Sequence, residues 1–173
     1  HNDTVSVPEV PTSKDSNQAT PDVIESAPTA EETISEPSEY EVMRTNAIAK
    51  KNRAIQTKLE KVISYTKQTM VAYMSEEDLN RLCTYVAEYS TGDTLQKISP
   101  VKVDSQLKSI DIMHFGWNIG KAFGRKRIHT ATFIKNVFAH TLRDSEISTI
   151  ERKMSHTESE CRIKLNGEIG SII

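Results

Sequence analysis

The sequence has few cysteines and lacks long apolar runs. Its two cysteines, Cys83 and Cys161, lie far apart and form no CxxC pair, which excludes a disulfide-rich scaffold and a cysteine-only zinc site. No stretch approaches the ~18 consecutive apolar residues that a membrane-spanning helix needs, and the mean hydropathy is −0.50. The chain also shows no apolar region typical of a signal peptide. We therefore predict a cytoplasmic protein that does not contact a membrane.

Motifs for catalysis and phosphate binding are missing as well. The sequence contains neither GxxxxGK[ST] nor GxGxxG. Residues 140–143 resemble one motif of tyrosine recombinases, but that family needs a downstream tyrosine nucleophile, and the last tyrosine is Tyr89. Asp111 and His114 lie three residues apart in an apolar setting, which favours a structural pair over part of a catalytic triad. The histidines and cysteines show no metal-binding spacing. We predict no enzyme, no cofactor and no metal.

Charge and proline are distributed unevenly along the chain. Residues 1–42 contain ten acids and one base, whereas residues 43–173 contain 21 bases and 14 acids, a net charge of +7. Five of the six prolines lie within residues 1–40, and no aromatic residue precedes Tyr40. Such a stretch buries too little apolar surface to offset its chain entropy. We predict a disordered acidic leader over residues 1–40, which either keeps the protein soluble or covers its basic body until nucleic acid displaces it.

The remaining chain, residues 41–173, is predicted to form a mainly α-helical domain. Apolar residues at helical spacing predict a long basic helix over 41–74, which has seven bases and one acid between Arg44 and Lys67. A second helix over 75–90 begins at a capping serine followed by three acids. Residues 104–173 are predicted to form a helix-turn-helix-like core followed by a C-terminal β-hairpin, a layout similar to a winged helix.

Three glycines repeat at intervals of four residues in the first helix of this core. Gly116, Gly120 and Gly124 share one face of the helix. In a membrane this pattern brings helices together, but the chain has no apolar span of that length. In a soluble chain the pattern therefore predicts close backbone packing at this helix face.

The predicted helix-turn-helix core also contains an unusual stretch without acids. Between Ile112 and Arg143 there are six bases and three histidines, but no aspartate or glutamate. Lysine and arginine contact phosphates, whereas Thr132 and Asn136 are of residue types that read base edges. The candidate DNA-binding residues are Arg125, Lys126, Arg127, His129, Thr132, Lys135, Asn136 and Arg143.

Three strings in this part of the chain resemble small helical proteins of conjugative transposons. The strings are DIMHFGWNI at 111–119, FIKNVF at 133–138 and STIERKM at 148–154. Their layout over residues 104–154 is similar to the C-terminal module of RteC-type regulators of element excision and transfer. The resemblance implies an accessory or regulatory DNA-associated role, such as transcription regulation, in a mobile genetic element.

Two functions follow from these patterns. The first is non-catalytic binding of nucleic acid, with DNA as the expected partner through its phosphate backbone and its base edges. The alternative is a helical protein–protein interaction adaptor without a nucleic-acid role, whose basic helix docks an acidic protein or a second copy of the chain. Binding through several phosphates weakens steeply with salt, whereas an interface with an apolar centre depends on salt far less.

Overall fold

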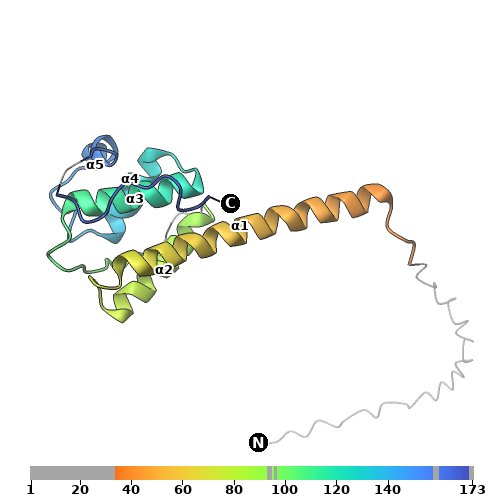
Figure 1. Cartoon of the computed structure of the whole chain (residues 1–173), viewed down its shortest axis with the longest axis horizontal. Coiled ribbons are helices and arrows are strands. Elements are labelled where there is room, and N and C mark those ends of the chain that lie inside the picture. The colour runs from red at the N-terminus through yellow and green to blue at the C-terminus, as the bar shows by residue number, and fades with distance from the viewer. Residues whose placement is uncertain (1–33, 93–94, 96, 158–159, 172–173) are drawn as a thin grey trace, which may run out of the picture. The chain divides into compact units, whose positions relative to one another are not determined.

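The computed structural model describes residues 34–92, 95, 97–157 and 160–171 (Figure 1). Ser38–Ile173 forms one compact unit. The mainly helical class is confirmed, and the predicted acidic leader, residues 1–40, lies almost entirely outside the described residues. The helices of the described residues are α1 (Glu39–Met70), α2 (Glu76–Ser90), α3 (Ser109–Phe123), α4 (Arg127–Val137) and α5 (Ile147–Lys153).

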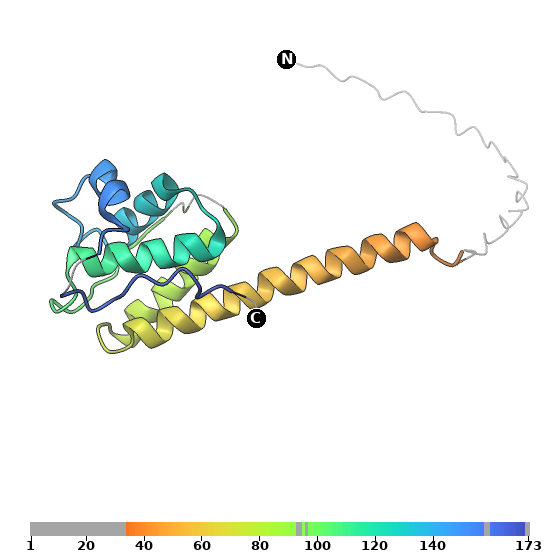
Figure 2. The same cartoon turned by 45° about the horizontal axis from the view of Figure 1, so that its top comes forward.

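Serine caps start the first two helices. The hydroxyl of Ser38 accepts from the amide of Glu41, while the Glu41 carboxylate accepts from the amide of Ser38, a reciprocal capping box. At α2, the hydroxyl of Ser75 accepts from the amide of Asp78, and acids occupy the first turn as the sequence predicts. After the turn that follows Met70, α2 runs back beside the C-terminal half of α1 (Figures 1 and 2).

Helix α3 lies at the centre of the body and contacts α1, α4 and α5. Most of its residues are buried, including Ile112, Phe115 and Ile119, which have no exposed surface. The Phe115 ring stacks on Tyr65 of α1 at 5.9 Å between ring centroids and meets Phe138 edge-on, also at 5.9 Å. Such aromatic pairs stabilise the core beyond the burial of their surface.

The glycine face of α3 packs tightly against α4. A Cβ atom added at Gly116 would lie 2.7 Å from Cγ2 of Ile134, and one added at Gly120 would lie 2.4 Å from the hydroxyl oxygen of Thr130. The close packing that the glycine repeat predicts is therefore present at these two positions. Gly124 has a different role, because it ends α3 in the left-handed conformation at φ 64°.

A buried polar face of α3 holds the C-terminal segment in place. The Asp111 carboxylate accepts from the backbone amides of Arg162 and Ile163, at 2.6 and 3.1 Å. The Asn118 side-chain amide donates to the carbonyl of Lys164, and its oxygen accepts from the amide of Asn166, at 2.9 and 2.7 Å. Side chains of α3 thus supply hydrogen-bond partners to the backbone of residues 160–167, as a neighbouring strand would do in a sheet.

His114 completes this polar face and has no exposed surface. Its two ring nitrogens lie 2.7 Å from the carbonyl oxygen of Ile163 and 2.5 Å from that of His156. Carbonyl oxygens only accept, so the ring is the donor in these contacts. Asp111 and His114 are therefore a structural pair bonded to the backbone, the interpretation that the sequence favoured.

The predicted C-terminal β-hairpin is wrong within the described residues. Residues 160–171 form turns and bends without a strand, and the two residues that follow lie outside the description. The alternating pattern before Asn166 marks which side chains face α3 rather than a strand, since Cys161 and Ile163 are buried while Arg162 and Lys164 are exposed. Without the hairpin, the described residues also lack the wing of a winged helix.

The Gly120 contact generates a stability prediction. We expect Gly120→Ala to lower the free energy of unfolding by about 1–3 kcal/mol, because the new methyl group would overlap the buried Thr130 side chain. Urea denaturation followed by circular dichroism measures this change. Lys121→Ala, at the exposed neighbouring position on the same helix, is the control and should stay within about 0.5 kcal/mol of the parent. Equal stability of the two variants would contradict the close packing.

Asp111 provides a second stability prediction. We expect Asp111→Asn to cost about 2–3 kcal/mol. The amides of Arg162 and Ile163 donate to Oδ1 and that of Lys108 donates to Oδ2, so an asparagine must turn a donor toward one of these two sites. The exposed Asp144 supplies the matched control, Asp144→Asn, whose denaturation midpoint should not move. Faster hydrogen exchange at Lys108, or at Arg162 and Ile163, in the Asp111 variant would locate the damage, and unchanged exchange at all three would refute the role assigned to this carboxylate.

Candidate nucleic-acid interface

Four of the eight candidate DNA-binding residues form side-chain hydrogen bonds within the fold: Thr132 bonds to its own helix, and three basic residues bond to other segments. Nη2 of Arg125 donates to the carbonyl of Ser90 at 2.8 Å. Nη1 of Arg127 donates to the hydroxyl of Ser155 at 3.0 Å, and Nζ of Lys135 donates to the carbonyl of Leu142 at 2.7 Å. These bonds tie the turn before α4 and the end of α4 to neighbouring segments, so part of the predicted phosphate-binding set serves the fold.

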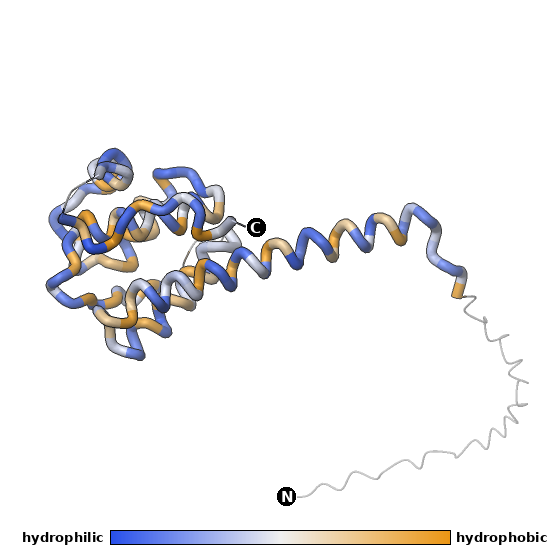
Figure 3. The backbone as a smooth tube through the Cα atoms, viewed as in Figure 1, coloured by the Kyte–Doolittle hydropathy of each residue, from blue (hydrophilic) through white to orange (hydrophobic). Residues whose placement is uncertain are grey.

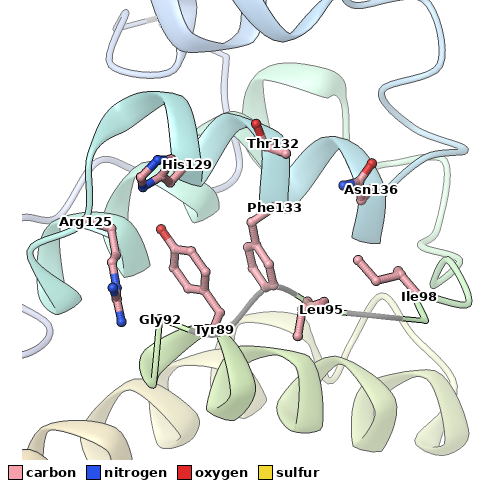
Figure 4. Close-up of a pocket in the computed structure, with 9 residues that line it drawn as sticks. All are labelled: Tyr89, Gly92, Leu95, Ile98, Arg125, His129, Thr132, Phe133 and Asn136. Carbon is pink, nitrogen blue, oxygen red and sulfur yellow. The ribbon is translucent and has the colours of Figure 1, made fainter.

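The candidates other than these three basic residues divide into two groups. His129 and Asn136 are exposed, Thr132 is half-buried, and all three border one cavity between α4 and the end of α2 (Figure 4). Lys126 and Arg143 are exposed, and their side chains make no hydrogen bond or ion pair to the rest of the described chain. The structure therefore gathers His129, Thr132 and Asn136 at one cavity. Lys126 and Arg143 do not line this cavity.

Helix α4 is buried along one face. Thr130, Ala131, Phe133, Ile134 and Val137 are all buried, because α4 packs against both α3 and α5. Its exposed positions are residues 127–129 in the first turn and Asn136 near the end. The helix–turn–helix order that the sequence predicts is present, but its second helix is built into the core.

A basic surface that the sequence analysis did not assemble crosses α1, α3 and the start of α4. We call it the cationic strip and define it as Lys51, Lys58, Lys121 and Arg127. Three neighbouring grooves connect its members: Lys51 and Lys58 line the first, Lys58 and Lys121 the second, and Lys121 and Arg127 the third. No carboxylate lines any of the three grooves within the described residues.

The N-terminal half of α1 extends away from the body (Figures 1 and 2). Every residue from 34 to 56 is exposed, whereas Val62, Thr66 and Met70 of the same helix are buried. We call residues 39–56 the free half of α1. It carries Arg44, Lys50, Lys51 and Arg53, and within the described residues ion pairs form only at Arg81. The bases of the free half are therefore available to an external anion.

Hydrophobic residues also recur along the free half (Figure 3). Ile48 and Ile55 are 46% and 56% exposed, and they lie seven residues apart in register with the buried Val62. Ile55 borders the first groove of the cationic strip, together with Phe123 of α3. The basic helix thus presents apolar as well as cationic groups, which bears on the choice between DNA and a protein partner.

Two other kinds of site find no support within the described residues. No cluster of three histidine, cysteine or acidic side chains within them is placed to hold a metal ion. None of the helices in the described ranges is long and apolar enough to cross a bilayer. Burial raises the pKa of the half-buried Cys83 thiol above its usual value, and the charge of Lys67 opposes this shift.

Comparison with known proteins does not assign the chain to a family. Protein-family models, curated proteins and solved structures were all searched, and no match was found in any of the three. The sequence resemblance over residues 104–154 is therefore neither supported nor contradicted, and the geometry of the site has to carry the functional argument.

The two adjacent bases of the α3–α4 turn should respond differently to truncation. We expect Arg125→Ala to lower the free energy of unfolding by about 1–2 kcal/mol, because it removes the bond to the Ser90 carbonyl and the contact with the Tyr89 ring. The exposed Lys126 should tolerate alanine without a change in melting temperature. Calorimetry of the two variants measures both, and equal melting temperatures would mean that Arg125 does not fasten the turn.

Proposed function

We propose that this protein is a non-catalytic DNA-binding protein whose contact surface is the cationic strip together with the free half of α1. The observation that carries the proposal is the set of unpaired bases in the free half, continued onto the body by Lys58, Lys121 and Arg127. The proposal keeps the function that the sequence predicts but moves its main surface from α4 to α1.

The arrangement of charge supports this assignment. Each lysine or arginine that reaches a phosphate releases condensed counterions, and a carboxylate facing the backbone would oppose that gain. The grooves that connect the cationic strip are free of carboxylates within the described residues. A DNA backbone lying across α1, α3 and the start of α4 would therefore contact lysine or arginine side chains from each of these three helices.

The shape of α1 also favours DNA. An α-helix with its side chains is about 10–12 Å wide, and the B-DNA major groove is about 12 Å wide. The free half is exposed over about five turns, so it can enter a groove without clashes from the body. Asn46 and Asn52, on this same stretch, are of a type that pairs with adenine edges.

A regulatory or accessory role in a mobile genetic element remains part of the proposal. It rests on the resemblance of residues 104–154 to RteC-type regulators. Most of that region forms the body that positions α1, through contacts of α3 with α1. In this proposal the helix-turn-helix-like core supports the DNA-binding helix rather than reading DNA itself.

A salt titration with charge-matched variants tests the DNA proposal. We expect the full chain to bind a random DNA duplex at low salt, and the triple variant Lys51→Ala, Lys58→Ala, Lys121→Ala to bind at least about tenfold more weakly. The slope of log affinity against log salt should fall by about 2–3 in that variant. Fluorescence polarisation at a series of salt concentrations measures both quantities.

The control removes the same charge elsewhere. Lys97, Lys102 and Lys153 are exposed and line none of the three grooves, so their triple alanine variant should bind DNA almost as tightly as the parent. An equal loss of DNA affinity in both triple variants would mean that net charge, and not the cationic strip, determines binding. Absence of binding at low salt would refute the proposal.

The exposed apolar residues of α1 favour a second candidate function, a protein–protein adaptor. An unpacked helix of this length is marginally stable in water, and Ile48 and Ile55 offer a partner the apolar contacts that the free half lacks. If this candidate is correct, Ile48→Ser with Ile55→Ser abolishes partner binding, leaves DNA affinity unchanged, and the binding of the partner changes little with salt.

A further inference from the structure

The cavity beside α4 has the size of a small-molecule site. It has a volume of about 230 Å³ and lies between α4, the α3–α4 turn and the segment that follows α2 (Figure 4). An engineered apolar cavity of about 150 Å³ is large enough for benzene. This cavity therefore has room for one six-membered ring with a short substituent.

One part of the cavity lining is apolar. Leu95 and Ile98 line it together with the Phe133 ring, which stacks on Tyr89 at 4.3 Å between centroids. Tyr89 is fixed in turn, because its hydroxyl shares a hydrogen bond of 2.7 Å with the Thr130 hydroxyl. A preformed apolar wall of this kind favours the ring of a ligand over water.

The polar part of the lining is cationic. Arg125 lies at one end, while His129 and Asn136 contribute an imidazole and an amide from positions about two turns apart on α4 (Figure 4). None of the described lining residues is acidic. The polar groups therefore match a ligand that carries negative charge, and they leave a cationic ligand without a partner.

The Arg125 guanidinium is held rigidly at the cavity. Its Nη2 donates to the Ser90 carbonyl, and its central carbon lies 5.9 Å from the centroid of the Tyr89 ring. Gly92, at φ 84°, makes room for it, since a Cβ there would lie 2.7 Å from Nη1. Its Nε is buried and closed to a ligand, whereas Nη1 makes no hydrogen bond to the described residues. A fixed guanidinium whose outer nitrogen keeps a free donor binds a carboxylate at little entropic cost.

We propose that this cavity is a binding site for a small carboxylate with a single apolar ring, whose carboxylate faces Arg125 and whose ring packs against Phe133, Leu95 and Ile98. Arg125 also lines the third groove of the cationic strip, but the proposed site does not rest on the DNA-binding proposal. His129, Thr132 and Asn136, which the sequence assigns to DNA, serve here as the rim of the cavity.

A titration of the full chain with phenylacetate tests the proposal. We expect saturable changes in ¹H–¹⁵N correlation spectra at Phe133, Asn136 and the other lining residues, with an affinity in the millimolar range or tighter. Phenylacetamide has the same shape without the charge, and we expect its affinity to be at least about tenfold lower. Adenine, a neutral planar ring, should behave like the amide.

A blocking variant and its control keep the test independent of folding. Asn136 is exposed at the rim, so Asn136→Trp should fill the entrance and abolish the phenylacetate shifts while the rest of the spectrum is retained. The exposed His140 lies outside the cavity, and His140→Trp should leave binding unchanged. Shifts that never saturate, equal affinity for phenylacetamide or adenine, or unaltered binding to Asn136→Trp would each overturn the proposal.

Discussion

The buried polar face of α3 is the constraint on which the rest of this fold depends. Asp111, His114 and Asn118 are fully or almost fully buried, and each bonds to the backbone of the C-terminal segment. A buried carboxylate or amide without partners would destabilise the core. The C-terminal segment therefore has to follow α3 in one register, and it covers the central helix in place of a sheet.

The opposite face of α3 fixes α4, and this contact decides which helix is free to bind. Because Gly116 and Gly120 let α4 approach closely, Thr130 and Ile134 become part of the core. Arg125 and Lys135 are then used to fasten the ends of α4. The same approach leaves a cavity along the exposed edge of α4, where Phe133 and Asn136 meet the segment after α2. Close packing of α3 thus produces both the proposed ligand site and the shift of the proposed DNA contact to α1.

Helix α1 is packed on the body along its C-terminal half and exposed to solvent along its free half. Its C-terminal half is held by Val62, Thr66 and Met70, whereas the free half shares the same pattern of apolar and basic residues without a body to pack on. Helices owe most of their stability to tertiary packing. Because the free half lacks such packing, a bound partner would stabilise it more than it would stabilise the helices already packed in the body. DNA would contact the lysines and arginines of the free half, and a protein partner would also contact Ile48 and Ile55.

The sequence by itself determined the helices, because caps such as Ser75 act on the backbone of the same helix. The repeat of Gly116 and Gly120 also indicated a closely packed helix face, but only the structure shows that α4 lies against it. The sequence also pointed to Asp111 and His114 as a structural pair. It could not exclude the C-terminal hairpin, since the alternation around Ile163 suits a strand and a segment packed on a helix equally well. Only the tertiary structure brought Lys58 beside Lys121 and placed Ile98 with Phe133 at one cavity, because the members of each pair are far apart along the chain, and packing alone sets their distance.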